Sequence, residues 1–113
     1  MTTNSEILTS YYAAFESQDW ATERALLHDD FRFRGPLQQS DGADQFIEDV
    51  RPLKCQFKDV QMIEQGDTVM AFYTCDLSQP FTGSFRMAER VTFRENKLQS
   101  SELLYDARAF PQM

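Results

Sequence analysis

Hydrophobic positions follow two different periods along this chain, with the change near Pro52. In the first half, apolar side chains recur at intervals of three and four residues, which is typical of helices that bury one face. We predict a first helix that begins at a cap formed by Asn4 or Ser5. Its buried face carries Ile7, Leu8, Tyr11, Tyr12 and Phe15.

Shorter elements are predicted for the rest of the first half. Asp19 can cap a second helix over residues 20–28, and FRFR at 31–34 alternates as a short strand that Gly35-Pro36 ends. A third helix, capped by Ser40 or Asp41, ends before Pro52 because a residue that precedes proline disfavours helix. It carries Phe46, Ile47 and Val50.

From Lys54 onward, apolar and polar residues alternate, which indicates strands that are buried on one face. We predict four strands, near residues 55–64, 68–78, 83–94 and 97–109. Helices followed by a long antiparallel sheet make an α+β fold in one domain over residues 1–113.

One charged residue interrupts the apolar face of the strand 83–94. That face carries Phe85, Met87, Val91 and Phe93, and Glu89 lies among them. Burial raises the pKa of a carboxyl, so Glu89 can act in a pocket as a general acid or an oxyanion donor. The alternative is that Glu89 reaches the rim or forms a structural ion pair with a nearby arginine.

The last hairpin predicts further partners for Glu89. A two-residue loop at Glu95-Asn96 places Arg94 opposite Lys97 and Glu89 opposite Glu102. The same register places Met87 opposite Leu104 and Phe85 opposite Asp106. Three carboxylates, those of Glu89, Glu102 and Asp106, would then share the apolar face.

Composition narrows the class of partner. The 113 residues include 10 Phe, 4 Tyr and 1 Trp, which suit a bulky core or the walls of an apolar cavity. A net charge of −7 argues against nucleic acid and anionic membranes as partners. The N-terminal segment lacks the basic and apolar regions of a signal peptide, so we expect a cytoplasmic protein.

Metal and thiol chemistry are not expected. Cys55 and Cys75 are predicted to stay reduced in the cytoplasm, and two cysteines with one histidine offer no zinc-ligand spacing. His28, at the polar end of the second predicted helix, is expected to face solvent. We therefore expect neither a metal nor another cofactor.

Three segments resemble the SnoaL-like, polyketide-cyclase-type branch of the nuclear transport factor 2-like superfamily. They are YYAAFESQDWATERALLHDDFRFRGP, QGDTVMAFY and FRENKLQSSELLYD, and the similarity covers nearly the whole chain. The resemblance implies a cystatin-like α+β barrel, in which a strongly curved, mainly antiparallel sheet forms a cone-shaped pocket that the helices close. It implies no single activity, because the superfamily includes cyclases, isomerases, hydratases, epoxide hydrolases and non-catalytic binders.

The resemblance also implies roles for single residues. Against the ketosteroid isomerase branch, Tyr11 matches the tyrosine that donates to the substrate oxyanion, and Glu89 matches the acid that shares this role. The general base of that branch falls on Gly35, which argues against steroid-type isomerisation. Against the SnoaL-type cyclases, Asp106 matches the acid/base aspartate. The alternative for Tyr11 is an ordinary core residue of the first helix.

These observations together predict a small-molecule-binding domain. If it is an enzyme, we expect acid–base isomerisation, cyclisation or hydration of a compact apolar carbonyl compound, with Glu89, Asp106 and Tyr11 as catalytic residues. The alternative is a non-catalytic ligand-binding or dimerisation module. By analogy with the superfamily, we expect a homodimer through the outer sheet face. The predicted substrate-binding residues are Phe15, Trp20, Phe31, Phe33, Tyr73, Phe85, Met87, Glu102 and Leu104.

Overall fold

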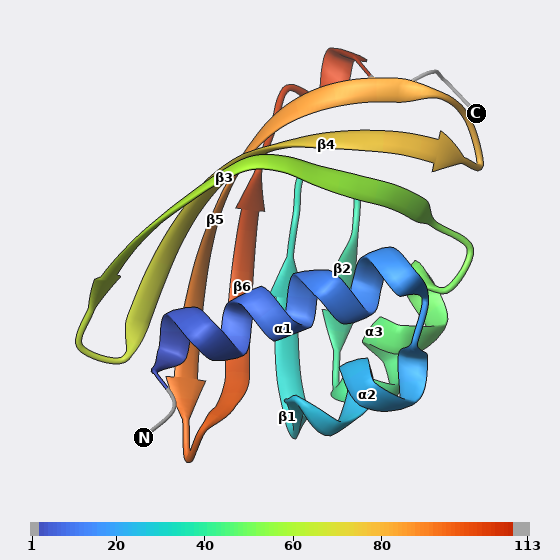
Figure 1. Cartoon of the computed structure of the whole chain (residues 1–113). Helices are drawn as coiled ribbons and strands as arrows, with labels where there is room; N and C mark the ends of the chain where they lie inside the picture. The colour runs from blue at the N-terminus through green and yellow to red at the C-terminus, as the bar shows by residue number, and fades with distance from the viewer. Residues whose placement is uncertain (1–2, 110–113) are drawn as a thin grey trace.

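Three α-helices and a six-stranded sheet make up most of the computed structural model, which describes residues 3–109 (Figure 1). The helices are α1 (Asn4–Ser17), α2 (Trp20–Ala25) and α3 (Ala43–Val50). The strands are β1 (Leu27–Arg34), β2 (Gln39–Asp41), β3 (Lys54–Gln65), β4 (Thr68–Gln79), β5 (Gly83–Arg94) and β6 (Lys97–Leu104), and a 3₁₀ turn, η1 (Ala107–Ala109), follows.

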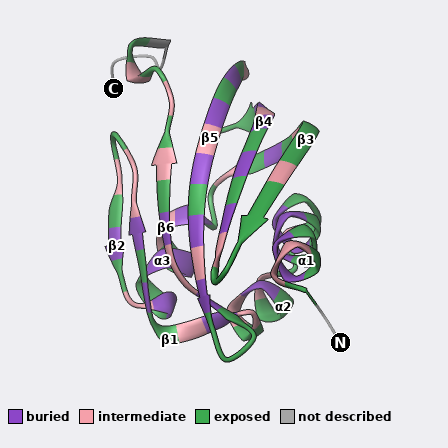
Figure 2. Cartoon of the chain, turned by 90° about the vertical axis from the view of Figure 1, so that its left-hand side faces the viewer, coloured by how far each residue is buried: buried purple, intermediate pink, exposed green. Residues whose placement is uncertain are grey.

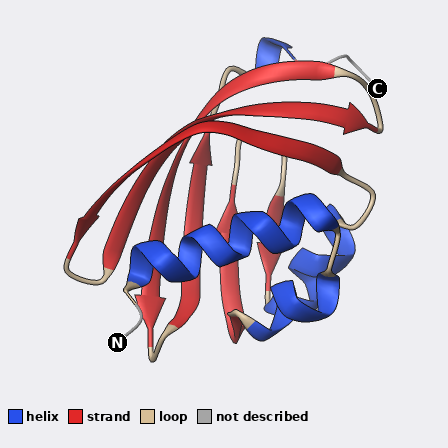
Figure 3. Ribbon diagram, in the orientation of Figure 1, coloured by secondary structure: helices blue, strands red, loops and turns tan. Residues whose placement is uncertain are grey.

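The sheet has the order β2-β1-β6-β5-β4-β3, and all neighbouring pairs are antiparallel except β1 and β6, which are parallel. It curves strongly but remains open, with β2 and β3 at its edges (Figure 3). Helix α1 crosses the concave side, while α2 and α3 lie together at one end (Figures 1 and 3). The predicted α+β class with a curved, mainly antiparallel sheet is confirmed.

Bulges help to produce the curvature. In β3 the register with β4 shifts between Lys58 and Gln61, and Asp59 has a positive φ of 55°. A bulge bends a strand and increases its twist. The long strands β3, β4 and β5 therefore arch over α1 instead of forming a flat layer (Figure 1).

The first helix begins one residue earlier than predicted. Thr3, not Asn4 or Ser5, is its N-cap, and Thr3 and Glu6 form a reciprocal capping box. The prediction that Asp19 caps the second helix is confirmed, since its side chain accepts a hydrogen bond from the Thr22 amide.

The segment after the second helix differs most from the prediction. Helix α2 ends at Ala25, and residues 27–30 belong to β1, because Leu27 pairs with Leu98 of β6. His28 is thus a strand residue whose ring contacts the Arg94 carbonyl. Strand β2 was not predicted, and α3 has Gly42 at its N-cap, without a side-chain cap from Ser40 or Asp41.

The last hairpin follows the predicted register only near its turn. Glu95 and Asn96 both adopt positive φ, and Arg94 pairs with Lys97 as predicted. The register then shifts by one residue between Thr92 and Phe93, so Glu89 pairs with Leu103 instead of Glu102. The final strand also ends at Leu104, five residues before its predicted end at 109.

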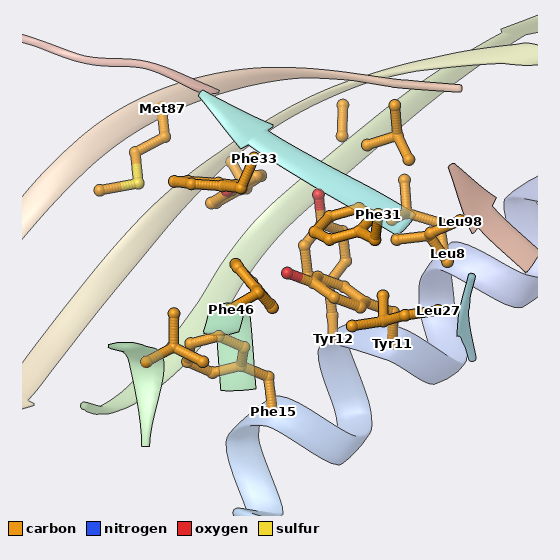
Figure 4. Packing of buried hydrophobic residues seen from close by; sticks show 14 of the residues in the cluster. Leu8, Tyr11, Tyr12, Phe15, Leu27, Phe31, Phe33, Phe46, Met87 and Leu98 are labelled. Carbon is orange, nitrogen blue, oxygen red and sulfur yellow. The ribbon is translucent and has the colours of Figure 1, made fainter. Parts of the chain in front are cut away.

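Buried and exposed residues alternate along β5, as the sequence pattern predicts (Figure 2). The inward side chains pack against aromatic residues of α1, β1 and α3. Phe46 of α3 stands at the centre of this packing, with ring centroids 5.1 Å from Phe31, 5.2 Å from Phe33 and 6.4 Å from Tyr11 (Figure 4).

The outer sheet face carries exposed apolar side chains on β3, β4 and β6, with half-buried Ala88 of β5 between them. Phe72 pairs with Ala88, which pairs with Leu104, and beside them Ile63 pairs with Met70. The guanidinium of Arg86 lies 4.3 Å from the centroid of the Phe72 ring. The homodimer contact expected through this face stays a prediction. Within residues 3–109, no helix is long and apolar enough to cross a membrane.

Candidate functional site

An apolar cavity of about 260 Å³ lies between α1 and the concave side of the sheet. This volume is near the lower end of the roughly 300–1,000 Å³ of small-molecule sites. Exposed Leu37 and Pro80, from the loops after β1 and β4, line one part of it, and buried Tyr12 and Glu89 line another. The lining residues are Tyr11, Tyr12, Phe15, Phe33, Gly35, Leu37, Gln38, Phe46, Val50, Leu53, Cys55, Phe57, Tyr73, Cys75, Leu77, Pro80, Phe81, Phe85, Met87, Glu89, Leu103 and Tyr105.

Among the described residues that line the cavity, Glu89 provides the only carboxyl group, and it is 3% exposed. Three hydroxyl groups from three elements donate to it. The Tyr12 hydroxyl of α1 and the Tyr73 hydroxyl of β4 lie 2.6 Å and 3.0 Å from Oε1, and Ser101 of β6 donates to Oε2. We call Glu89, Tyr12, Tyr73 and Ser101 the hydroxyl–carboxyl cluster.

Two opposing effects determine the protonation of Glu89. Burial disfavours the charged form and raises the pKa of Glu89, while the hydrogen bonds from Ser101, Tyr12 and Tyr73 stabilise the carboxylate and lower it. Burial prevails, so the pKa of Glu89 is raised above its usual value. Burial also raises the pKa values of Tyr12 and Tyr73, and the adjacent Glu89 adds to this effect. Both tyrosines therefore remain hydrogen-bond donors.

The cluster of three carboxylates predicted from the hairpin register is wrong. Because of the bulge in β6, Glu102 pairs with Arg90, is exposed, and lies 3.8 Å from the Arg90 guanidinium. Ser101 takes the inward position beside Glu89. Asp106 follows the end of β6, is exposed, and forms an ion pair of 2.9 Å with Arg108. That ion pair and the associated hydrogen bonds lower the pKa of Asp106.

The tyrosine that binds Glu89 is Tyr12, not Tyr11. Both side chains are buried and line the cavity, and both project from α1 toward the aromatic core (Figure 4). Of these two tyrosines, Tyr12 is the one whose hydroxyl donates to Glu89 among the contacts of residues 3–109. Tyr11 packs against Phe46 and Phe15, and burial raises its pKa.

The predicted substrate-binding residues divide into two groups. Phe15, Phe33, Tyr73, Phe85 and Met87 line the cavity, together with Gly35. The other four lie outside the lining: Trp20 packs against Phe15 with ring centroids 5.3 Å apart, Phe31 is fully buried behind the wall, and Glu102 and Leu104 are exposed on the outer face.

Sequence reasoning missed a second buried acid. Glu23 of α2 is 0% exposed, and neither of its carboxyl oxygens has a hydrogen-bond partner among the described residues. Burial, with a smaller contribution from the charge of Glu89, raises the pKa of Glu23 to about 9. The sequence does contain a sign of this burial. Glu23 follows Trp20 by three residues and precedes Leu27 by four, which is the spacing of one helix face.

No group of three or more potential metal ligands occurs within the part of the chain that the structure describes. The polar and nucleophilic side chains that line or border the cavity are Glu89, the tyrosine and serine hydroxyls and the two thiols.

We predict that Glu23 makes stability fall as pH rises. Above about pH 4.5, Glu23 releases its proton in the unfolded chain but keeps it in the folded chain. The unfavourable contribution of Glu23 to the free energy of folding therefore grows from pH 4.5 until the pH approaches 9. Glu23→Met removes this contribution. Its stabilising effect should be larger at pH 7.5 than at pH 5 by roughly 3 kcal/mol, measured by urea denaturation. Glu48→Met, at an exposed site on α3, serves as the control. An equal effect of Glu23→Met at both pH values would contradict the prediction.

Comparison with known proteins identifies the family of this chain. A family model described as the SnoaL-like domain matches residues 8–100, whereas no curated protein sequence matches the chain. Among solved structures, an NTF2-like protein of unknown function from Cytophaga hutchinsonii is 17% identical and has a TM-score of 0.87, with 96% of this chain and 94% of that chain covered. A provisionally assigned polyketide cyclase of Pseudomonas putida is 17% identical with a TM-score of 0.83, and 96% of each chain is covered.

A third similar structure is that of an LEH-like epoxide hydrolase from M. tuberculosis. It is 15% identical and has a TM-score of 0.85, with 94% of this chain and 84% of that chain covered. At these identities the structural likeness shows the fold and not the activity. Because the family model spans most of the sequence, the chain belongs to the SnoaL-like domain family.

Proposed function

We propose that this domain binds a compact, largely apolar organic molecule in the cavity, with an oxygen atom of the ligand held by the hydroxyl–carboxyl cluster. The observation that carries this proposal is the contrast within one cavity. Its wall is mostly aromatic and aliphatic, and a single carboxyl with converging hydroxyls provides a polar anchor. Few polar groups in an apolar cavity are the usual composition of a small-molecule site.

The chemistry of the cluster favours a carbonyl or similar acceptor oxygen. Tyr12 and Tyr73 are donors, and burial favours the protonated form of Glu89, which can also donate. Within residues 3–109, the cavity lining contains no lysine or arginine to neutralise a negatively charged ligand. Two structural neighbours bear names that refer to polyketides and epoxides, and those substrates belong to these neighbours. Such names are compatible with a neutral, oxygen-containing ligand here.

A second candidate function is acid–base catalysis on that ligand, and the raised pKa of Glu89 favours it. Asp106 is exposed and paired with Arg108, so it is not a base for this cavity. Glu89 would then have to act alone. As a carboxylate it would take a proton from the carbon beside the carbonyl and return it at the same or a conjugated position. The Tyr12 and Tyr73 hydroxyls, each with one hydrogen to donate, would turn from Glu89 to the ligand oxygen during this step.

We predict that the cluster distinguishes a ketone from the hydrocarbon of the same shape. 1-Tetralone should bind more tightly than tetralin in isothermal titration, and Tyr12→Phe should weaken ketone binding about 3- to 10-fold, since one net hydrogen bond is worth about 1 kcal/mol. The hydrocarbon should bind equally to both proteins. Tyr11→Phe is the matched control, because Tyr11 lines the same cavity without bonding Glu89. Equal losses in both variants would contradict the assignment to Tyr12.

Hydrogen exchange distinguishes catalysis from binding alone. In D₂O, a catalytic Glu89 should exchange the protons beside the carbonyl of bound 1-tetralone faster than buffer does, as followed by proton NMR. Glu89→Gln should abolish this acceleration because an amide cannot take up the proton. Exchange that is no faster than in buffer, or that persists in Glu89→Gln, would contradict the catalytic candidate. A ligand that binds without exchange would favour the non-catalytic binding module.

A further inference from the structure

The two cysteines of the chain lie on the same wall of the cavity. Cys55 is on β3 and Cys75 on β4, and both side chains are buried and line the cavity. In the antiparallel register, Cys55 pairs with Leu77 and Cys75 pairs with Phe57, so the two cysteines are diagonal neighbours on one face of the sheet. Diagonal neighbours on adjacent strands have Cα atoms about 7–8 Å apart, with the Cβ atoms somewhat closer.

Each thiol shifts the pKa of the other. Hydrogen bonding with Cys75, together with burial, raises the pKa of Cys55, and the same hydrogen bond lowers the pKa of Cys75. Burial and the nearby Asp76 and Glu89 carboxylates act in the opposite direction on Cys75. The pair is therefore asymmetric, with Cys55 as the thiol that keeps its proton and Cys75 as the better acceptor and nucleophile.

The local backbone allows the two sulfurs to approach further. A register shift lies between Lys54 and Cys55, directly at the start of β3. Bulges interrupt the ladder locally, so this end of the strand can adjust more readily than a regular one. A disulfide usually joins Cα atoms no more than about 6.8 Å apart, so bond formation at this diagonal pair requires a small movement of this end of the strand.

We propose that Cys55 and Cys75 form a dithiol that a hydroperoxide entering the cavity oxidises to an intramolecular disulfide. Cys75 loses its proton, its thiolate attacks the peroxide oxygen, and the O–O bond breaks. Cys75 becomes a sulfenic acid, and the leaving alkoxide or hydroxide takes up a proton equivalent to the one that Cys75 released, which gives an alcohol, or water from hydrogen peroxide. The Cys55 sulfur then attacks the sulfenic sulfur, and water leaves with the Cys55 proton. Two electrons pass from the thiol pair to the peroxide.

This site is distinct from the hydroxyl–carboxyl cluster and does not depend on the ligand proposed above. It assigns a modification to residues of the cavity wall. The disulfide would cross-link the β3–β4 hairpin where it borders the cavity.

Peptide mapping after treatment of the folded protein with hydrogen peroxide tests the proposal. Cleavage after Lys54, Lys58 and Arg86 separates the cysteines into peptides 55–58 and 59–86. We expect one disulfide-linked species that contains both peptides, with the two free thiols lost at the same rate. The cross-linked peptide should disappear on reduction with dithiothreitol. Separate sulfinic or sulfonic acids on the two peptides would overturn the proposal. Oxidation of exposed Met70 to the sulfoxide shows that the peroxide has acted, so free thiols that persist beyond that point would also overturn it.

Single variants test the order of the two steps. In Cys55→Ser, a sulfenic acid should accumulate on Cys75 and be trapped by dimedone, because the resolving thiol is absent. In Cys75→Ser, trapping on Cys55 should be at least about tenfold slower. Equal trapping rates would overturn the assigned roles. If either variant folds poorly, the peptide map of the wild-type protein still shows whether the disulfide forms.

Discussion

The interaction on which the site depends is the burial of one carboxyl group in an apolar cavity. A charged or neutral carboxyl that leaves water must find hydrogen-bonding partners inside the protein, or its burial is strongly unfavourable. Glu89 finds them on α1, β4 and β6, through Tyr12, Tyr73 and Ser101. These contacts connect the helix to the concave face of the sheet, and they leave one polar anchor within a wall of aromatic side chains. Glu23 provides the contrast, because its carboxyl is buried without such partners among the described residues.

A shift of one residue in the last hairpin determines which groups reach this anchor. In a strand, neighbouring side chains point to opposite faces, so a bulge exchanges the inward and outward sets beyond it. The bulge beside Phe93 turns Ser101 inward and Glu102 outward. A second carboxylate opposite Glu89 would have repelled it, whereas the Ser101 hydroxyl donates to it. The site therefore contains one acid and several donors, which is suited to holding an oxygen atom.

The sequence predicts the parts of the structure that local patterns control. Alternation in the strand 83–94 places Glu89 inward, helical spacing puts Tyr11 and Tyr12 on the buried face of α1, and Asp19 is recognisable as a cap. It does not predict β2, nor the parallel pairing of Leu27 with Leu98, because these depend on contacts between distant segments. Which of Tyr11 and Tyr12 bonds Glu89 depends on how α1 is rotated about its axis against the sheet. The apolar pattern does not determine this rotation, because both tyrosines belong to the buried face. Ser101 faces Glu89 only because of the bulge in β6, and the residues of the turn at 95–96 do not predict that bulge.

The central claim is that burial outweighs three hydrogen bonds and keeps the Glu89 carboxyl protonated beyond the usual pH range of a glutamate. Carbon-13 NMR of protein labelled at the glutamate side-chain carboxyl tests it most directly, with the resonance assigned by its loss in Glu89→Gln. The predicted result is a titration of Glu89 clearly above 4.5, the ordinary pKa of a glutamate side chain, in the wild-type protein. A titration at or below that value would contradict the claim, because it would show that the three hydrogen bonds offset or outweigh the effect of burial.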